Sequence, residues 1–142
     1  MPDTEIGTIA RWLPDYAIGV EVVDAEHRGL FRMAEKLHRG IRSGRGREIV
    51  GPLLDELFDY TCYHFEHEEQ LMEQIAYPHY PTHCQQHREL RSQILVMKEG
   101  FAAGESDMAI EMLRFVTDWL KCHTTTSDRR IGTYMRKCGM VT

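Results

Sequence analysis

The chain contains no apolar run that approaches the roughly 20 residues of a membrane-spanning helix, so an integral membrane protein is not expected. It also contains no cluster of lysine and arginine. Acidic and basic residues are interspersed and leave a formal net charge of −5. Because a nucleic-acid surface needs clustered positive charge, we expect no nucleic-acid partner. No segment shows the strict apolar–polar alternation of a half-buried strand, so no β-structure is expected.

Targeting and disulfide signals are also missing. The N-terminal residues MPDTEIGTIARW carry acids and no apolar core, which argues against a signal peptide and favours a cytoplasmic location. The four cysteines form no C-x-x-C pair and predict no disulfide framework. Cys62, Cys84 and Cys122 each lie within two residues of a histidine, which leaves a cysteine–histidine zinc site open. Because neighbouring helical residues are rotated by about 100°, we favour buried or half-buried free thiols, Cys138 included.

Helical periodicity dominates the rest of the chain. Apolar residues recur at spacings of three and four in four segments, which glycine, proline and serine separate. Four amphipathic helices with short connections predict a single all-α domain over residues 1–142, an antiparallel up-down-up-down four-helix bundle. An N-terminal arm (residues 1–18) precedes the bundle, and a short C-terminal helix around residues 129–137 follows it. The four helices are expected at about residues 22–41, 47–75, 82–103 and 107–124.

Two local features refine these helices. The run TTTS at residues 124–127 forms helix poorly, so the fourth helix is expected to loosen before Asp128. Asp24 lies near the start of the first helix, where its carboxylate suits the exposed backbone donors of that helix.

Histidines and carboxylates interrupt the apolar stripes of these helices at matching depth. His64 and Glu68 stand four residues apart, one helical turn, and His83 and His87 repeat that spacing. The full set is His27, His64, Glu68, His83, His87, His123 and Asp128. In an up-down bundle these positions converge at one end of the core. A single buried histidine is commonplace, but seven polar side chains in one small core are hard to satisfy mutually, which favours a metal site.

The order and spacing H…HxxxE…HxxxH…HxxxxD resembles the hemerythrin family in its single-domain bacterial form. The matching pieces are GVEVVDAEHRGLF, YTCYHFEHEEQLM, PTHCQQHREL and DWLKCHTTTSDRR. One residue departs from the family pattern, since Thr124 stands where an apolar residue usually follows the last histidine; it is expected to loosen the helix end or to admit water near the metal. The nearby His67 is expected to point toward solvent or an interface. Most of the acidic face formed by Glu66, Glu69 and Glu73 is expected to lie at the surface, and none of these residues is assigned a role.

The resemblance implies two iron ions bridged by Glu68, Asp128 and an oxo or hydroxo group. By the family pattern, His83, His87 and His123 hold one iron, and His27 and His64 hold the other. These ligands leave one coordination position open, on the two-histidine iron. Ligand type alone permits manganese as well, and the family favours iron.

The function implied is reversible O2 binding for storage, delivery or sequestration, with NO or small anions such as azide as further ligands. Apolar residues at helical spacing are expected to line the O2 pocket: Phe31, Leu71, Ile94 and Trp119. They fit an ordinary core equally well. Two alternatives stay open: a sensor of O2, NO or redox state that acts through a partner, which the lack of an output domain after Asp128 disfavours, and a di-iron peroxidase or oxidase.

Overall fold

The computed structural model of the chain describes residues 11–44, 46–105 and 107–140, and these residues form helices and no strand. The elements are η1 (Pro14–Tyr16), α2 (Glu21–Arg42), α3 (Arg47–Gln74), α4 (Tyr80–Ala102), α5 (Met108–His123), η2 (Thr124–Asp128) and α6 (Arg129–Lys137). The ends of the four long helices differ from the predicted ends by no more than two residues. Residues 1–10 of the predicted arm lie outside the described residues. No described helix is both long and apolar enough to cross a membrane.

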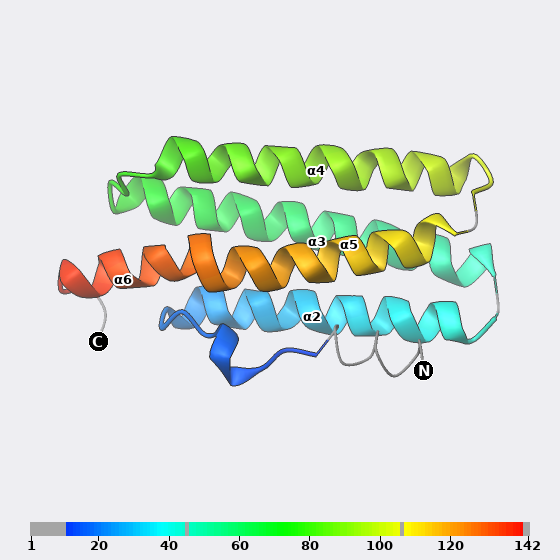
Figure 1. Cartoon of the computed structure of the whole chain (residues 1–142), viewed down its shortest axis with the longest axis horizontal. Helices are drawn as coiled ribbons and strands as arrows, with labels where there is room; N and C mark the ends of the chain where they lie inside the picture. The colour runs from blue at the N-terminus through cyan, green and yellow to red at the C-terminus, as the bar shows by residue number, and fades with distance from the viewer. Residues whose placement is uncertain (1–10, 45, 106, 141–142) are drawn as a thin grey trace.

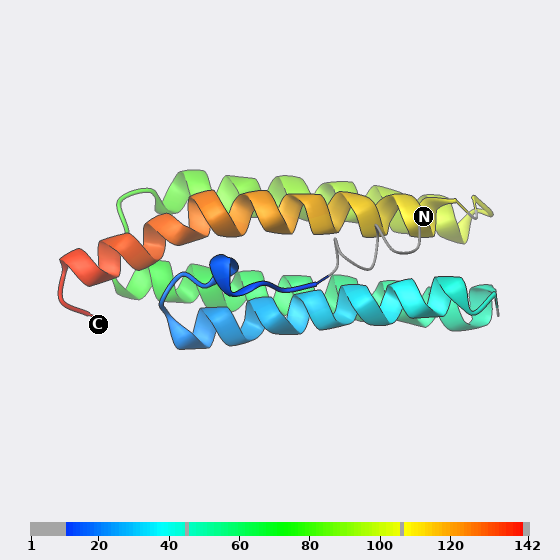
Figure 2. The same ribbon diagram turned by 60° about the horizontal axis from the view of Figure 1, so that its bottom comes forward.

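The four long helices form a closed ring. Helix α2 contacts α3 and α5, and α4 contacts the same two helices. Consecutive helices run in opposite directions, and α6 continues beyond the end of the bundle from the last turn of α5 (Figure 1). The rotated view in Figure 2 shows the same ring with η1 lying along α2. The prediction of an all-α antiparallel four-helix bundle with a short C-terminal helix is therefore confirmed.

Two apolar clusters fill the bundle, and a polar layer lies between them. The larger cluster includes Leu30, Phe31, Leu57, Phe65, Leu90, Ile94, Leu113 and Leu120. The end cluster contains Ile18, Val20, Val23, Met72, Tyr77, Cys84, Ile131 and Met135. On α2, for example, His27 lies between Val23 of the end cluster and Leu30 of the larger cluster. Apolar side chains therefore shield the polar layer on both sides.

The segment before α2 is attached to the bundle by buried polar contacts. Both oxygens of Asp24 accept hydrogen bonds from this segment, from the backbone N–H groups of Ile18 (2.8 Å) and Gly19 (3.2 Å). Asp24 therefore binds the preceding segment, and the expectation that it serves the donors of its own helix is wrong. On α6, a Cβ atom at Gly132 would lie 2.1 Å from the carbonyl oxygen of Ile18, so only glycine permits this close approach.

Candidate metal centre

The seven predicted ligand residues lie together in the polar layer, and each is at least 94% buried. Their nitrogen and oxygen atoms form two groups, in each of which the atoms lie within 4.8 Å of one another. The three-histidine group comprises Glu68, His83, His87, His123 and Asp128. The two-histidine group comprises His27, His64, Glu68 and Asp128. Both carboxylates therefore belong to both groups.

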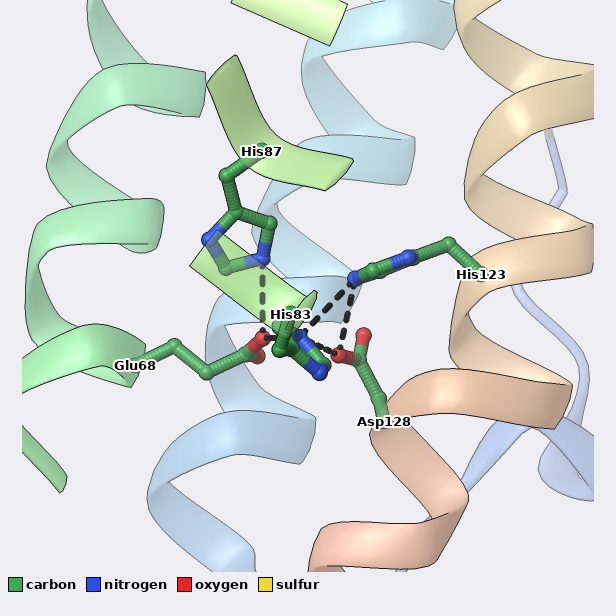
Figure 3. A group of neighbouring side chains, drawn as sticks. All are labelled: Glu68, His83, His87, His123 and Asp128. Atoms are coloured by element: carbon green, nitrogen blue, oxygen red, sulfur yellow. Dashed lines mark hydrogen bonds and ion pairs between the residues drawn. The ribbon is translucent and has the colours of Figure 1, made fainter. Parts of the chain in front are cut away.

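Figure 3 shows the three-histidine group, in which Glu68 and Asp128 approach from opposite sides with His83 between them. The Nε2 atom of His83 lies 2.7 Å from Glu68 Oε1 and 2.9 Å from Asp128 Oδ1. His87 Nε2 lies 3.2 Å from the same Glu68 oxygen, and His123 Nε2 lies 3.1 Å from the same Asp128 oxygen. Three imidazole nitrogens and two carboxylate oxygens thus face one small volume.

The two-histidine group uses the other oxygen of each carboxylate. His64 Nε2 lies 3.1 Å from Glu68 Oε2, and His27 Nε2 lies 3.0 Å from Asp128 Oδ2 and 3.6 Å from Glu68 Oε2. Each carboxylate therefore directs one oxygen to each histidine group, which is the arrangement that a bridge between two cations requires.

A π-helical turn brings Asp128 into this layer. His123 and Asp128 are five residues apart, so a regular α-helix would turn their side chains about 140° away from each other. Segment η2 is instead a π-helix, in which the backbone N–H of Arg129 donates to the carbonyl of Thr124, five residues back. This wider turn places both side chains on the inward face. The predicted loosening of the helix takes this form, and the helix continues into α6 without ending.

Several buried atoms of the cluster lie close to other polar atoms of the cluster yet make no hydrogen bond of acceptable geometry. They are His27 Nε2, His87 Nε2, Glu68 Oε2 and Asp128 Oδ1. In addition, His83 Nε2 and His123 Nε2 lie 3.0 Å apart, although only one of two neutral rings can donate in such a contact. Atoms left without partners at this depth are costly unless an ion binds them. Imidazole and carboxylate donors suit first-row transition-metal ions, so the residues present fit such ions.

The electrostatics of the metal-free cluster follow from burial opposed by close charge pairs. Burial lowers the pKa of His27, but Asp128 and Glu68 outweigh it and raise that pKa to about 10. The same balance raises the pKa of His83 to about 9. Burial raises the pKa of Glu68, whereas His64, His27 and His83 together hold it well below its usual value. In the metal-free site, imidazole rings with raised pKa values therefore carry protons, and a bound cation would displace those protons.

Two outer carboxylates hold the ligand rings in place, and sequence reasoning missed both. The Nδ1 atom of His64 lies 2.8 Å from Glu26 Oε1, and the Nδ1 atom of His67 lies 2.6 Å from Glu26 Oε2. The Nδ1 atom of His87 lies 2.8 Å from Glu69 Oε2. His67 is exposed, as predicted. Glu69 is instead partly buried against a predicted ligand ring, so the expectation that it lies at the surface without a role is wrong. These contacts join different helices, so the spacing of residues within one helix could not predict them. The available signal was general: a histidine that binds a metal needs a hydrogen-bond acceptor at its second ring nitrogen.

Aromatic rings cover the three-histidine group. Phe65 stacks on His87 with ring centroids 3.8 Å apart and planes 3° apart, and Trp119 stacks on His123 at 4.1 Å and 17°. Of the residues predicted to line an O2 pocket, Phe31 and Ile94 belong to the larger cluster, and Trp119 packs against it. Leu71, in contrast, is partly exposed and packs against the end cluster.

The cysteines take no part in either group of possible metal ligands among the described residues. All four are free thiols: Cys84 is buried, Cys62 is half-buried, and Cys122 and Cys138 are exposed. The expectation of buried or half-buried thiols is therefore wrong for Cys122 and Cys138. Cys122 lies one residue before His123, and helical rotation turns its side chain outward.

The fold and the cluster together define a four-helix-bundle protein with a histidine- and carboxylate-rich site capable of binding cations. The family model described as "Hemerythrin HHE cation binding domain" matches residues 18–134, and the chain belongs to the hemerythrin family.

Individual relatives agree with this assignment. The chain is 34% identical to the bacteriohemerythrin of Stenotrophomonas maltophilia (strain R551-3) over 118 residues, which cover 83% of this chain and 76% of that protein. It is 33% identical to the bacteriohemerythrin of Methylococcus capsulatus (strain ATCC 33009 / NCIMB 11132 / Bath), over 83% of this chain and 89% of the relative. A solved structure, "Crystal structure of hemerythrin:wild-type", matches with a TM-score of 0.80 and 31% identity, over 87% of this chain and 95% of that chain.

Proposed function

We propose that this chain binds O2 reversibly at a pair of iron ions held by its five buried histidines, Glu68 and Asp128. The supporting observation is that each of the two carboxylates directs one oxygen to each histidine group. Two cations bridged by Glu68, Asp128 and an oxo or hydroxo group fit that arrangement. Family membership favours iron over manganese, which the same donors accept.

The ligands divide unequally between the two ions in this proposal. His83, His87 and His123 would hold one iron, and His27 and His64 would hold the other. The two-histidine side offers one protein ligand fewer, which would leave a position for an external ligand. When present, the reduced iron pair supplies that open position and the electrons that reversible O2 binding needs.

The chain's own residues favour binding over oxidation of a substrate. The five imidazole ligands are neutral when they bind metal, so the site carries less negative charge than a carboxylate-rich di-iron site. Phe65 and Trp119 cover the rings of His87 and His123, and apolar clusters lie on both sides of the polar layer. This cover reduces the access of water and protons, which would promote irreversible oxidation. The role is O2 storage, delivery or sequestration, and the cytoplasmic location stays a prediction from the N-terminal residues.

The visible spectrum of the iron-loaded, anaerobically reduced protein tests this proposal. It is recorded before O2 is added, after O2 is added, and again after purging with argon, with the metal content of the same sample measured. A charge-transfer band that appears with O2 and disappears on purging is the expected result. A band that persists, with the protein locked in the ferric state, would instead favour an enzyme or a redox sensor. Absence of bound iron would refute the metal assignment.

A further inference from the structure

Thr124 carries a hydroxyl group that has no partner within the described part of the protein. Its side chain is fully buried, and its Oγ1 atom makes no hydrogen bond. Threonine in a helix usually donates to the carbonyl four residues back. The four other threonines on the same continuous helix do so: Thr117 to Leu113 (2.8 Å), Thr125 to Lys121 (2.7 Å), Thr126 to Cys122 (2.7 Å) and Thr133 to Arg129 (3.1 Å). A buried hydroxyl without a partner destabilises a protein and calls for a ligand or water to explain it.

The position of Thr124 on the helix indicates which side of the metal centre its hydroxyl faces. Thr124 directly follows His123 and is rotated from it by about 100°. Trp119 lies on the other flank of His123, where it stacks on that ring and lines a surface cavity with Gln86 and Glu89 of α4. Helix α5 packs between α4 and α2. The flank opposite Trp119 therefore faces α2, the helix that carries His27.

The π-helical turn supports the same direction. Thr124 and Asp128 are the two buried residues of η2, and the widened turn places them on one inward face. Asp128 extends from His123 toward His27, since its Oδ1 lies near His123 and its Oδ2 lies 3.0 Å from His27 Nε2. Thr124 thus shares a face with the carboxylate that reaches the two-histidine group.

We propose that the Thr124 hydroxyl donates a hydrogen bond to a ligand held on the two-histidine side, and so selects ligands that offer an acceptor atom. This inference rests on the proposed function, because it needs the metal pair to hold the ligand. The ligand class is a small anion with exposed lone pairs, for which azide is the probe. A threonine hydroxyl stays neutral over the whole working pH range, so the donor is always available.

Three variants test the role of this hydroxyl. Thr124→Val removes it at nearly constant shape, Thr124→Ser retains it, and Thr117→Val removes a buried hydroxyl that already has a carbonyl partner on the same helix. Each oxidised, iron-loaded protein is titrated with azide through its charge-transfer band, and the iron content is measured in parallel. The thermal unfolding midpoint, Tm, of each metal-free protein is measured separately.

The azide Kd of Thr124→Val should rise roughly three- to tenfold, which is the change expected from the loss of one hydrogen bond. Thr124→Ser and Thr117→Val should keep the wild-type Kd within about twofold. The metal-free Thr124→Val protein should have a higher Tm than wild type, by a few degrees, because an unsatisfied buried hydroxyl is gone.

Three outcomes would overturn the inference. The first is an azide Kd of fully iron-loaded Thr124→Val that equals the wild-type value. The second is an azide Kd of fully iron-loaded Thr124→Ser that rises as much as that of Thr124→Val. The third is a lower Tm of metal-free Thr124→Val, which would mean that the hydroxyl already has a partner inside the protein. If wild-type protein binds no iron pair, the proposed function itself fails, and the metal content distinguishes that case.

Discussion

Replacing Glu26 by glutamine should weaken metal binding on the two-histidine side. Glu26 is 14% exposed in its side chain and contacts the Nδ1 atoms of both His64 and His67. Burial raises its pKa, but the hydrogen bonds from the two histidines outweigh that effect and lower it, so Glu26 is a carboxylate at neutral pH. Glutamine keeps the shape and removes the charge. Its amide nitrogen is a donor, so it can accept from only one of the two rings.

The size of the effect follows from the role of Glu26 behind His64. A hydrogen-bonded carboxylate fixes the ring orientation and raises the basicity of a ligating histidine, and its loss typically lowers metal affinity ten- to hundredfold, about 1.4–2.7 kcal/mol. Because His64 belongs to the group with fewer histidines, the loss should concentrate on one of the two ions. Bound metal should therefore fall from two ions toward one ion per chain as a chelator is added.

Chelator competition with metal analysis measures this effect. Glu66→Gln is the matched control: it makes the same change of charge two residues from His64, on an exposed side chain for which no contact with a ligand is seen. Glu69→Gln should act similarly through His87, but on the three-histidine ion. If Glu26→Gln and Glu66→Gln released metal at the same chelator concentration, the positioning role of Glu26 would be refuted.

Four further predictions concern the cluster and the aromatic side chains that cover it. Glu68→Ala or His87→Ala should bind fewer than two ions per chain and unfold at lower temperature, and retention of two ions in either variant would contradict the ligand assignment. Acidification should release the metal, because protons compete for the imidazoles; full retention well below about pH 4 would argue against histidine ligation. Without metal, the pKa values of His27 (about 10) and His83 (about 9) exceed the value of about 6.5 for an unfolded histidine. The free energy of unfolding should therefore fall as pH rises from about 6.5 to 10. Urea unfolding at pH 6 and pH 9 measures this change, and a higher free energy of unfolding at pH 9 would refute it. Phe65→Leu should oxidise faster in air when reduced and iron-loaded, since the smaller side chain covers the His87 ring less well, and an unchanged rate would contradict that protective role.

The bundle and the convergence of the seven polar residues could be predicted from the sequence because both depend on helical period. Spacings of three and four define the apolar stripe, and the same period puts His64 with Glu68, and His83 with His87, on one face. Short connections then force neighbouring helices to run antiparallel, which brings His27, His64, His83 and His123 to one end. No contact between distant residues had to be known in advance.

Contacts outside that period were not predictable in the same way. Glu26 reaches His64 from α2 and Glu69 reaches His87 from α3, and both depend on how helices are rotated against each other. Leu71 illustrates the same limit: it shares a stripe with Glu68 in the sequence, yet it packs toward the end cluster, because a stripe does not say on which side of the polar layer a residue lies. Period identifies a face, whereas packing decides the neighbour.

The turn at η2 shows how a site can dictate an irregular helix. The spacing of five between His123 and Asp128 conflicts with the α-helical period, so either the helix ends or its turn widens. The chain widens the turn, and the hydroxyls of Thr125 and Thr126 bind the carbonyls of Lys121 and Cys122 beside it. The poor helix propensity of residues 124–127 therefore coincides with a turn in which regular α-helical hydrogen bonding is lost and His123 and Asp128 are placed on one face. Thr124 departs from this pattern, because its hydroxyl is left unbonded at the turn that positions Asp128.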